Sequence, residues 1–522
     1  MEVTSATFPD YLPFILNDIS VSCFVSLDFE LSGLAFAPFI PTKPQTLQER
    51  YEQTKAAAEK YQILQVGLTI CHENLETASY CVKPYNFNLN PIPHRDSEVN
   101  RDWTSSSRAM EFLLRHGFSM KTMCQHGIQY LSRAEEQFAL ARAKERYNQT
   151  PRQDMDIKED DHKSLEFLAE VRTMITDWLA KGKDRAQRRN LLPSNQEVPL
   201  GIRSDGYDAM QKWLVHQLVA NEFPNLRSRT GSKFIQIDAV DVKSEQAAEE
   251  QRVKIKKAQL QKHIGFRWVA ESLVGGNLEE LGSEMFRPLM RRIKNPTYGI
   301  DTMVNRVKTC LQINRPVLVG HNMFCDLLFF HACFLGPLPD TIEEFQTAIH
   351  KLFPVLIDTK YLDTYDCGST NPASSLADLH AKLMNVDTPK IELDPRFTKY
   401  RWRAISHEAG YDSMICAMAF IKLAGQIQRG DSIPSPPKSP DIEDEEASPV
   451  VEASDHVSLP TTLADTGCPE IHALADKGVL LPRLGSKFWE DYGNRLRVFG
   501  TMERMVRVGV KTTKESHLLD MD

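Results

Sequence analysis

Near the start of the chain, a short apolar segment runs directly into two carboxylates. Residues 23–27 (CFVSL) carry no formal charge and are predicted to form a buried strand, which Asp28, Phe29 and Glu30 follow. Because successive side chains of a strand alternate between its faces, Asp28 and Glu30 share one face and Phe29 points to the other. Acids at the end of a buried strand are costly unless something neutralises them. Such a pair can hold a divalent cation, although it is also common at a solvated strand end.

Two further acids stand at the starts of predicted helices. Residues 317–330 (VLVGHNMFCDLLFF) predict an apolar strand, a turn and an apolar helix with Asp326 in its first turn. Residues 405–420 (ISHEAGYDSMICAMAF) predict an apolar helix that Asp412 opens, with His407 on a mobile loop before it. Taken alone, Asp326 is an ordinary first-turn acid favoured by the helix dipole, and Asp412 is an ordinary N-cap.

The four acids together favour a different interpretation. They occur at a strand end and at two helix starts, and a histidine precedes the last of them. Clustered carboxylates repel one another unless cations lie between them, and Mg²⁺ prefers oxygen ligands. Two such ions about 3.5–4 Å apart activate a water and stabilise the leaving oxygen in phosphodiester hydrolysis. A histidine with a near-neutral pKa can take the proton from that water. The set is therefore the one that two-metal phosphodiester chemistry requires.

The spacing Asp28-x-Glu30, Asp326, His407-x-x-x-x-Asp412 resembles the DEDD exonuclease pattern in its His-containing form. The Tyr-containing form would place a tyrosine at position 408, where this chain has glutamate. The chain is also similar to the poly(A)-specific ribonuclease (PARN) family over most of residues 1–428, in the segments DFELSGL, RYEQTKAAAEKYQILQVGLTI, YNFNLNPIP, SSSRAMEFLLRHGF, GIQYLSRAEE, GHNMFCDLLFFHACFLGPLP and FPVLIDTKYL. Phe29 departs from that family, whose members often carry a small residue there. Since Phe29 points away from the acids, we expect activity to be retained.

The resemblance implies an α/β fold of the ribonuclease-H-like DEDD type with a mixed central sheet. It implies that Asp28, Glu30, Asp326 and Asp412 hold two Mg²⁺ ions and that His407 is the general base. The implied reaction is 3′→5′ hydrolysis of RNA to 5′-mononucleotides. The implied partner is a single-stranded RNA 3′ end, above all poly(A). The resemblance also implies a nuclear and cytoplasmic location and allows a homodimer.

Several functions remain open within and beyond this class. Deadenylation of mRNA is one candidate function, and 3′-end trimming of small non-coding RNAs is the other. Some trimming relatives carry a C-terminal membrane anchor. The absence of a long apolar run in this chain favours the deadenylase and no membrane partner. A catalytically silent RNA-binding protein could use the same scaffold, although the complete set of acids and His407 argues against it. A DNA exonuclease would share the metal chemistry, and only the family resemblance disfavours it.

The domain organisation follows from changes in composition along the 522 residues. A hairpin is expected from the strands 63–70 and 77–89, and a helix from 105–118. Residues 429–466 are rich in Pro, Ser and acids, and this composition is typical of a disordered linker. The expected parts are a nuclease domain in two pieces (1–165 and 256–428), an inserted nucleic-acid-binding domain with flanking helices (166–255), the disordered linker (429–466) and a short C-terminal segment (467–522).

Inside the insertion, residues 212–237 resemble a small single-stranded nucleic-acid-binding domain named for an Arg-xxx-His pair. Here the pair is Lys212 and His216, four residues apart on one predicted helix face. A cation and an imidazole together can contact phosphate, but lysine lacks the bidentate geometry of arginine. The sequence leaves RNA binding and a purely structural role equally open for this pair.

The C-terminal segment is shorter than the RNA-recognition fold that follows the nuclease in the resembling family, which puts cap binding in doubt. The stretch FWEDYGNRLRVFG carries aromatic side chains that could stack on bases, but we expect it to pack on the nuclease. The net charge of −8 requires that any nucleic-acid binding use local basic patches. The ten scattered cysteines and the lack of a signal peptide predict free thiols in an intracellular protein.

Overall fold

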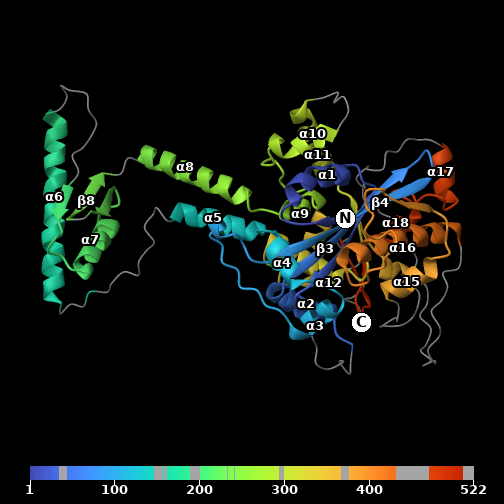
Figure 1. Ribbon diagram of the computed structural model, residues 1–522. Coiled ribbons are helices and arrows are strands. Elements are labelled where there is room, and N and C mark those ends of the chain that lie inside the picture. The colour runs from blue at the N-terminus through green and yellow to red at the C-terminus, as the bar shows by residue number, and fades with distance from the viewer. Residues whose placement is uncertain are drawn as a thin grey trace, which may run out of the picture. The chain divides into compact units, whose positions relative to one another are not determined.

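A computed structural model describes residues 1–34, 44–145, 157, 161–188, 200–231, 233–239, 242–292, 299–365, 375–430 and 469–509. The chain forms two compact units (Figure 1). The first comprises Met1–Gln137 and Gln259–Asp522, and the second comprises Phe138–Ala258. The predicted inserted domain, 166–255, lies within the second unit. The predicted linker, 429–466, lies outside the described residues except for its first two positions.

The first unit is built on an eight-stranded sheet, which is mixed, as the family resemblance implied. Its strand order is β1-β4-β3-β2-β9-β10, and β11 and β5 also pair with β4. The pairs β2–β3 and β3–β4 are antiparallel, whereas β9 pairs in parallel with β2, and β10 pairs in parallel with β9. The strands are β1 (Glu2–Val3), β2 (Phe24–Leu31), β3 (Ile63–Asn74), β4 (Ser79–Asn90), β5 (Ile128–Gln129), β9 (Val317–Gly320), β10 (Leu356–Asp358) and β11 (Lys390–Leu393).

Helices cover both faces of this sheet. One face packs on α16, with α15 beside it, and the other face packs on a larger core that includes α1, α9, α11 and α12. The helices of the unit are α1 (Phe8–Ser20), α2 (Leu47–Lys60), α3 (Ser107–Arg115), α4 (Met120–His126), α5 (Arg133–Glu145, which runs into the second unit), α9 (Arg267–Leu273), α10 (Arg287–Arg292), α11 (Ile300–Ile313), α12 (Phe324–Phe330), α13 (Ile342–Leu352), α14 (Thr359–Asp363), α15 (Leu376–Leu383) and α16 (Ala409–Arg429).

Several predicted boundaries were wrong. The first buried strand does not end before the acids; it continues through them to Leu31, because β3 pairs with it along this whole length. The helix that Asp412 was predicted to open begins earlier, at Ala409, and its N-cap is Glu408. The hairpin of β3 and β4 is confirmed; β3 continues four residues beyond its predicted end, whereas β4 begins two residues and ends one residue later than predicted.

The second unit packs α6 (His162–Arg188) and α7 (Ala209–Glu222) with a three-stranded antiparallel sheet. The strand order is β6-β8-β7. Its strands are β6 (Leu200–Arg203), β7 (Leu226–Thr230) and β8 (Phe234–Ala239). The strand β7 has the sequence LRSRT, whose polar side chains do not show the alternation of apolar and polar residues that predicts a strand. The helix α8 (Val242–Gln261) follows.

The C-terminal segment packs on the nuclease, as expected. It forms α17 (Pro469–Asp476), α18 (Lys487–Tyr492), β12 (Arg495–Arg497) and β13 (Met505–Arg507). Phe488 and Trp489 are buried against Phe420 of α16. Asn494 exchanges backbone and side-chain hydrogen bonds with Leu356 of β10. The segment therefore covers the β10 edge of the sheet.

Two smaller expectations concern thiols and membranes. The cysteines in the described part of the chain, eight of the ten, are free thiols. Across the described residues, we find no helix that combines the length and the apolar character needed to cross a bilayer.

Candidate active site

The face of the sheet beneath the N-terminal end of α16 is polar. Asp28 pairs with Gly67 on β3, and Glu30 pairs with Gln65. Because paired residues lie on the same face, both acids point toward α16. Phe29 is buried in the core on the opposite face, as predicted.

Polar side chains of β3 and β4 hold the start of α16 on this face. Gln65 Oε1 accepts a hydrogen bond from the backbone N–H of Ala409, and Asn86 Oδ1 accepts one from Gly410, each at 3.0 Å. These contacts satisfy N–H groups that a helix leaves without an internal partner. A third link joins the hydroxyls of Thr69 and Ser413 at 2.9 Å. The helix is therefore positioned by side chains of the sheet.

Gly67 is what allows this close approach. A Cβ atom at position 67 would lie 1.7 Å from the backbone oxygen of Ala409. The carbonyl of Ala409 therefore occupies the volume that any other side chain would need. Since Gly67 lies directly opposite Asp28, the helix start is brought beside that carboxylate.

This packing gathers three of the four predicted acids. Asp412 lies in the first turn of α16, and ligand atoms of Asp28, Glu30 and Asp412 lie within 4.8 Å of one another. Asp326 lies in the first turn of α12, which follows β9. Since β9 pairs in parallel with β2, Asp326 lies close enough for its charge to raise the pKa of both Asp28 and Glu30.

The four carboxylates share an environment that opposes their ionisation. Burial raises the pKa of Asp28 and Glu30 well above the usual range, and the charges of Asp412 and Asp326 raise both pKa values further. Burial also raises the pKa of Asp326 to about 7 and that of Asp412 to about 7. Among the described residues, no lysine or arginine forms an ion pair with any of the four. A buried group of acids without a basic partner fits a divalent cation.

His407 lies just outside α16 in a left-handed backbone conformation, with φ +63°. Its backbone N–H donates to Asp412 Oδ2 at 3.0 Å. Its ring contacts Phe112 and His116 at the end of α3, with centroids 4.9 and 4.3 Å away. Burial and the neighbouring His116 lower the pKa of His407. The imidazole is therefore held neutral near pH 7, beside α3 and next to the carboxylate group.

Sequence reasoning missed a fifth acid, Asp358. It is fully buried at the end of β10 and accepts backbone hydrogen bonds from Asn322 (2.7 Å), Lys360 (3.0 Å) and Arg497 (2.9 Å). Burial raises the pKa of Asp358 to about 6, and its charge in turn raises the pKa of Asp326. Its position at the end of an apolar strand was the available signal. Asp358 ties the turn after β9, the start of α14 and the C-terminal segment together.

In the second unit, α7 carries Lys212 and His216 four residues apart, as predicted. His216 Nδ1 lies 2.7 Å from Ser228 Oγ, and its Nε2 lies 2.7 Å from Thr230 Oγ1, both on β7. These contacts fix the ring against the small sheet. They give His216 a structural role, and RNA binding by the pair stays a prediction.

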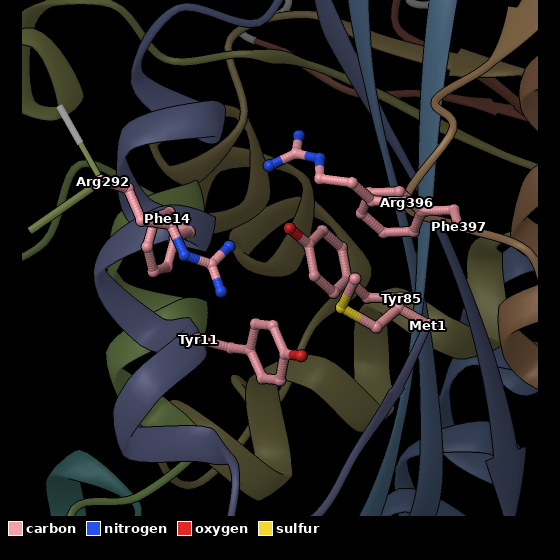
Figure 2. A pocket seen from close by; sticks show the side chains of 7 residues that line it. All are labelled: Met1, Tyr11, Phe14, Tyr85, Arg292, Arg396 and Phe397. Atoms are coloured by element: carbon pink, nitrogen blue, oxygen red, sulfur yellow. The ribbon is translucent and has the colours of Figure 1, made fainter. Parts of the chain in front are cut away.

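A cavity of about 240 Å³ opens on the other face of the large sheet (Figure 2). Tyr85 of β4 faces it, whereas the next residue, Asn86, faces α16. The other lining residues are Met1, Tyr11, Phe14, Arg292, Arg396 and Phe397. Arg396 is held by both oxygens of Asp394, and Arg292 lies over the ring of Phe14. The cavity is separated from the carboxylates by the sheet itself.

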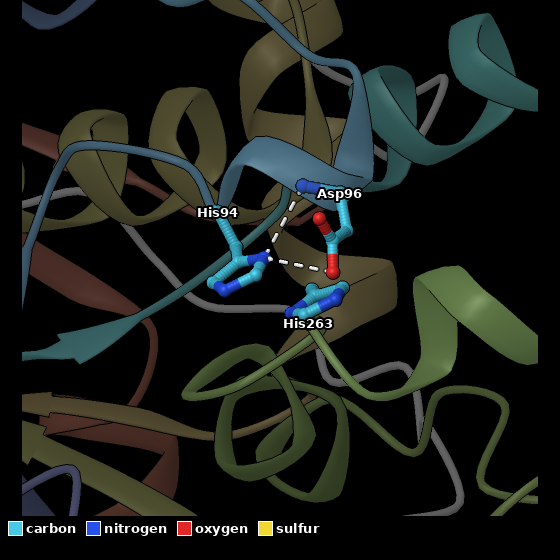
Figure 3. A group of neighbouring side chains, drawn as sticks. All are labelled: His94, Asp96 and His263. Atoms are coloured by element: carbon cyan, nitrogen blue, oxygen red, sulfur yellow. Dashed lines mark hydrogen bonds and ion pairs between the residues drawn. The ribbon is translucent and has the colours of Figure 1, made fainter.

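His94, Asp96 and His263 form a second cluster with potential ligand atoms within 4.8 Å of one another (Figure 3). The two imidazoles stack with centroids 4.2 Å apart and an interplanar angle of 8°. His94 Nδ1 accepts a hydrogen bond from the backbone N–H of Asp96 at 3.2 Å. Because a nitrogen lone pair lies in the plane of its ring, two nearly parallel rings do not point at one common ion. The stack instead joins the segment after β4 to the segment after α8.

Comparison with known proteins places the chain in a family. Residues 3–420 match the CAF1 family ribonuclease, and the chain belongs to this family. Poly(A)-specific ribonuclease PARN of Xenopus laevis is 25% identical over 467 residues, which cover 84% of this chain and 64% of that protein. The chain thus spans less than two thirds of that relative. The pre-piRNA 3′-exonuclease trimmer of Bombyx mori is 24% identical over 436 residues, or 81% of this chain and 71% of that one. Pop2p of S. pombe, in a Mg²⁺- and Mn²⁺-bound structure, aligns with TM-score 0.35 and 12% identity over 80% of this chain and 90% of its own.

Proposed function

We propose that this chain is a divalent-cation-dependent 3′→5′ exoribonuclease that releases 5′-mononucleotides. One observation carries the proposal. A member of a ribonuclease family brings Asp28, Glu30 and Asp412 together on one buried face, with Asp326 beside them and no basic partner in the described residues. Buried carboxylates grouped in this way can bind divalent cations that also contact the phosphate oxygens of a substrate.

In this mechanism, Asp28, Glu30, Asp326 and Asp412 would hold two Mg²⁺ ions, which would supply an activated water and neutralise charge at the leaving oxygen. Asp28 and Glu30 offer oxygens from one strand, so their separation is fixed by the backbone. Asp412 and Asp326 offer oxygens from helix first turns. His407 takes the proton from the attacking water, for which its lowered pKa keeps it neutral.

We propose poly(A) as the first substrate to test, because relatives named poly(A)-specific ribonuclease match across most of this chain. Trimming of small-RNA 3′ ends is the second candidate, supported by the similarity to the pre-piRNA 3′-exonuclease trimmer. Both use the same chemistry and differ in how the RNA is selected. A nuclear and cytoplasmic location fits either substrate.

The test uses purified full-length protein on RNAs labelled at the 5′ or the 3′ end. We expect the 5′-labelled RNA to shorten stepwise and the 3′-labelled RNA to release a labelled mononucleotide at once. EDTA and the Asp28→Asn variant should abolish both. RNAs ending in A, in U or in mixed sequence separate deadenylation from trimming, and a DNA of the same sequence tests sugar selection. Internal cleavage, or a rate unaffected by EDTA, would refute the proposal.

A further inference from the structure

The segment before His407 carries an unusually exposed aromatic side chain. Trp402 is 91% exposed, and it is flanked by Arg401 and Arg403, which are also exposed. Tryptophan is normally buried to a large extent, so this degree of exposure points to a contact made with another molecule. The two arginines add positive charge to a protein whose net charge is −8.

The segment is anchored on both sides of the exposed residues. Tyr400 is buried and hydrogen-bonds Glu408, which forms an ion pair with Lys399 at 2.6 Å. On the other side, Ile405 packs against the cluster of Tyr400, Tyr411, Met414 and Ile415. Trp402 is therefore presented from a fixed base.

The side chains of both arginines lack an acidic partner among the described residues. Arg401 and Arg403 form no ion pair with any residue in the described part of the chain. Glu408, the acid at the start of α16, already forms an ion pair with Lys399, which also pairs with Glu2. The guanidinium groups are thus available to an anionic partner, and guanidinium binds phosphate with two parallel hydrogen bonds.

The position of the segment ties it to the carboxylates. Trp402 precedes His407 by five residues, so an extended chain places the two no more than about 18 Å apart. The backbone N–H of His407 donates to Asp412, and Ile405 packs against the cluster that contains Tyr411, the neighbour of Asp412. An RNA strand whose 3′ end lies at the carboxylates can reach Trp402 within a few nucleotides.

We propose that Arg401, Trp402 and Arg403 form a binding site for the single-stranded RNA upstream of the scissile bond. Trp402 stacks on a base, and the two arginines bind the adjoining phosphates. Aromatic stacking with flanking cations is the general means by which proteins hold single strands without reading their sequence. This inference rests on the proposed function for its substrate. The C-terminal aromatics Phe488 and Trp489, by contrast, are buried and cannot stack on RNA.

The experiment measures KM and kcat of the full chain on A-tailed RNAs of increasing length. Trp402→Ala should raise KM by about 5- to 100-fold on a long RNA, the usual worth of one stacked base, and progressively less as the RNA becomes too short to reach it. Trp402→Phe should recover most of the loss. Arg401→Gln with Arg403→Gln should lower the slope of log affinity against log salt by about 1.4, since each phosphate contact on a single strand accounts for about 0.7. Ile313→Ala, which truncates another exposed apolar side chain, serves as the control and should change nothing.

The outcome separates this inference from the proposed function. If the parent protein degrades RNA and Trp402→Ala has the parent KM at every length, the binding site is wrong and the exonuclease stands. The exposed Trp402 would then be assigned to contact with a protein partner. If the parent degrades no RNA, the proposed function fails, and direct binding of a fluorescent A-oligonucleotide by the parent and Trp402→Ala still decides the site. Equal affinity in that assay overturns the inference.

Discussion

Replacing Gly67 with alanine tests how the site is assembled. The added Cβ would lie 1.7 Å from the carbonyl oxygen of Ala409, whereas an ordinary contact begins at 3.4 Å. The start of α16 must therefore retreat by about 1.7 Å, the difference of the two distances. The two hydrogen bonds that Gln65 and Asn86 accept from the start of α16, both 3.0 Å long, would break or lengthen, and Asp412 would move away from Asp28.

Two consequences follow, and they differ in size. Overpacking of this kind costs about 1–3 kcal/mol of unfolding free energy, which leaves most of the protein folded. A displacement near 1 Å at reacting groups costs about 100-fold in rate, so we expect kcat to fall by at least that factor. The Mg²⁺ concentration needed for half-maximal activity should rise as well, because one ligand has moved.

The assay is kcat at saturating RNA as a function of Mg²⁺ concentration, below the temperature at which the variant begins to unfold. Gly282→Ala is the matched control, since a Cβ at position 282 meets nothing within 4 Å. We expect this control to behave as the parent. A Gly67→Ala protein with the parent kcat and the parent Mg²⁺ dependence would show that the contact between β3 and α16 does not place Asp412, and would refute the reasoning.

Three further predictions concern charge and RNA affinity. Burial raises the pKa of Asp326 from 3.8 to about 7, so the metal-free protein loses stability as the pH rises across that interval. At 1.36 kcal/mol per pH unit, the loss in unfolding free energy is about 4 kcal/mol. In EDTA, Asp326→Asn should therefore raise the urea midpoint of unfolding at pH 8 but not at pH 4. An equal midpoint at pH 8 would contradict this. A general base must be neutral, and the pKa of His407 is lowered, so the single-turnover rate should fall only below about pH 6.5. This decrease at low pH should be absent in His407→Ala. A decrease that persists in His407→Ala would mean that a group other than His407 titrates. Substituting Lys212 and His216 together should weaken RNA binding more than it slows cleavage at saturating RNA, whereas unchanged affinity across a salt titration leaves the pair a structural role.

The sequence was most informative where local patterns decide the outcome. The apolar runs before Asp28 and Asp326, and the apolar helix around Asp412, were enough to place all four acids on the right elements. They also gave the opposite orientation of Phe29. The order and spacing of the acids carried the resemblance to the DEDD exonucleases, and that resemblance implied the mixed α/β nuclease fold.

Other features depend on contacts that no local pattern encodes. The continuation of β2 through its acids is set by pairing with β3, and the early start of α16 is set by Gln65 and Asn86 on distant strands. Asp358 gains its importance from a hydrogen bond to Arg497, which lies 139 residues away in the C-terminal segment. Trp402 went unnoticed because the sequence alone does not distinguish an exposed tryptophan from a buried one.

The central claim is that four carboxylates hold the cations and that His407 acts only as the base. Calorimetric titration of Mg²⁺ into the parent, Asp326→Ala and His407→Ala proteins tests it most directly. We expect the parent and His407→Ala to bind Mg²⁺ equally, because all four carboxylates remain, and Asp326→Ala to bind it poorly. Loss of Mg²⁺ binding in His407→Ala to the same degree as in Asp326→Ala would make His407 a metal ligand, and undiminished binding in Asp326→Ala would remove Asp326 from the metal site.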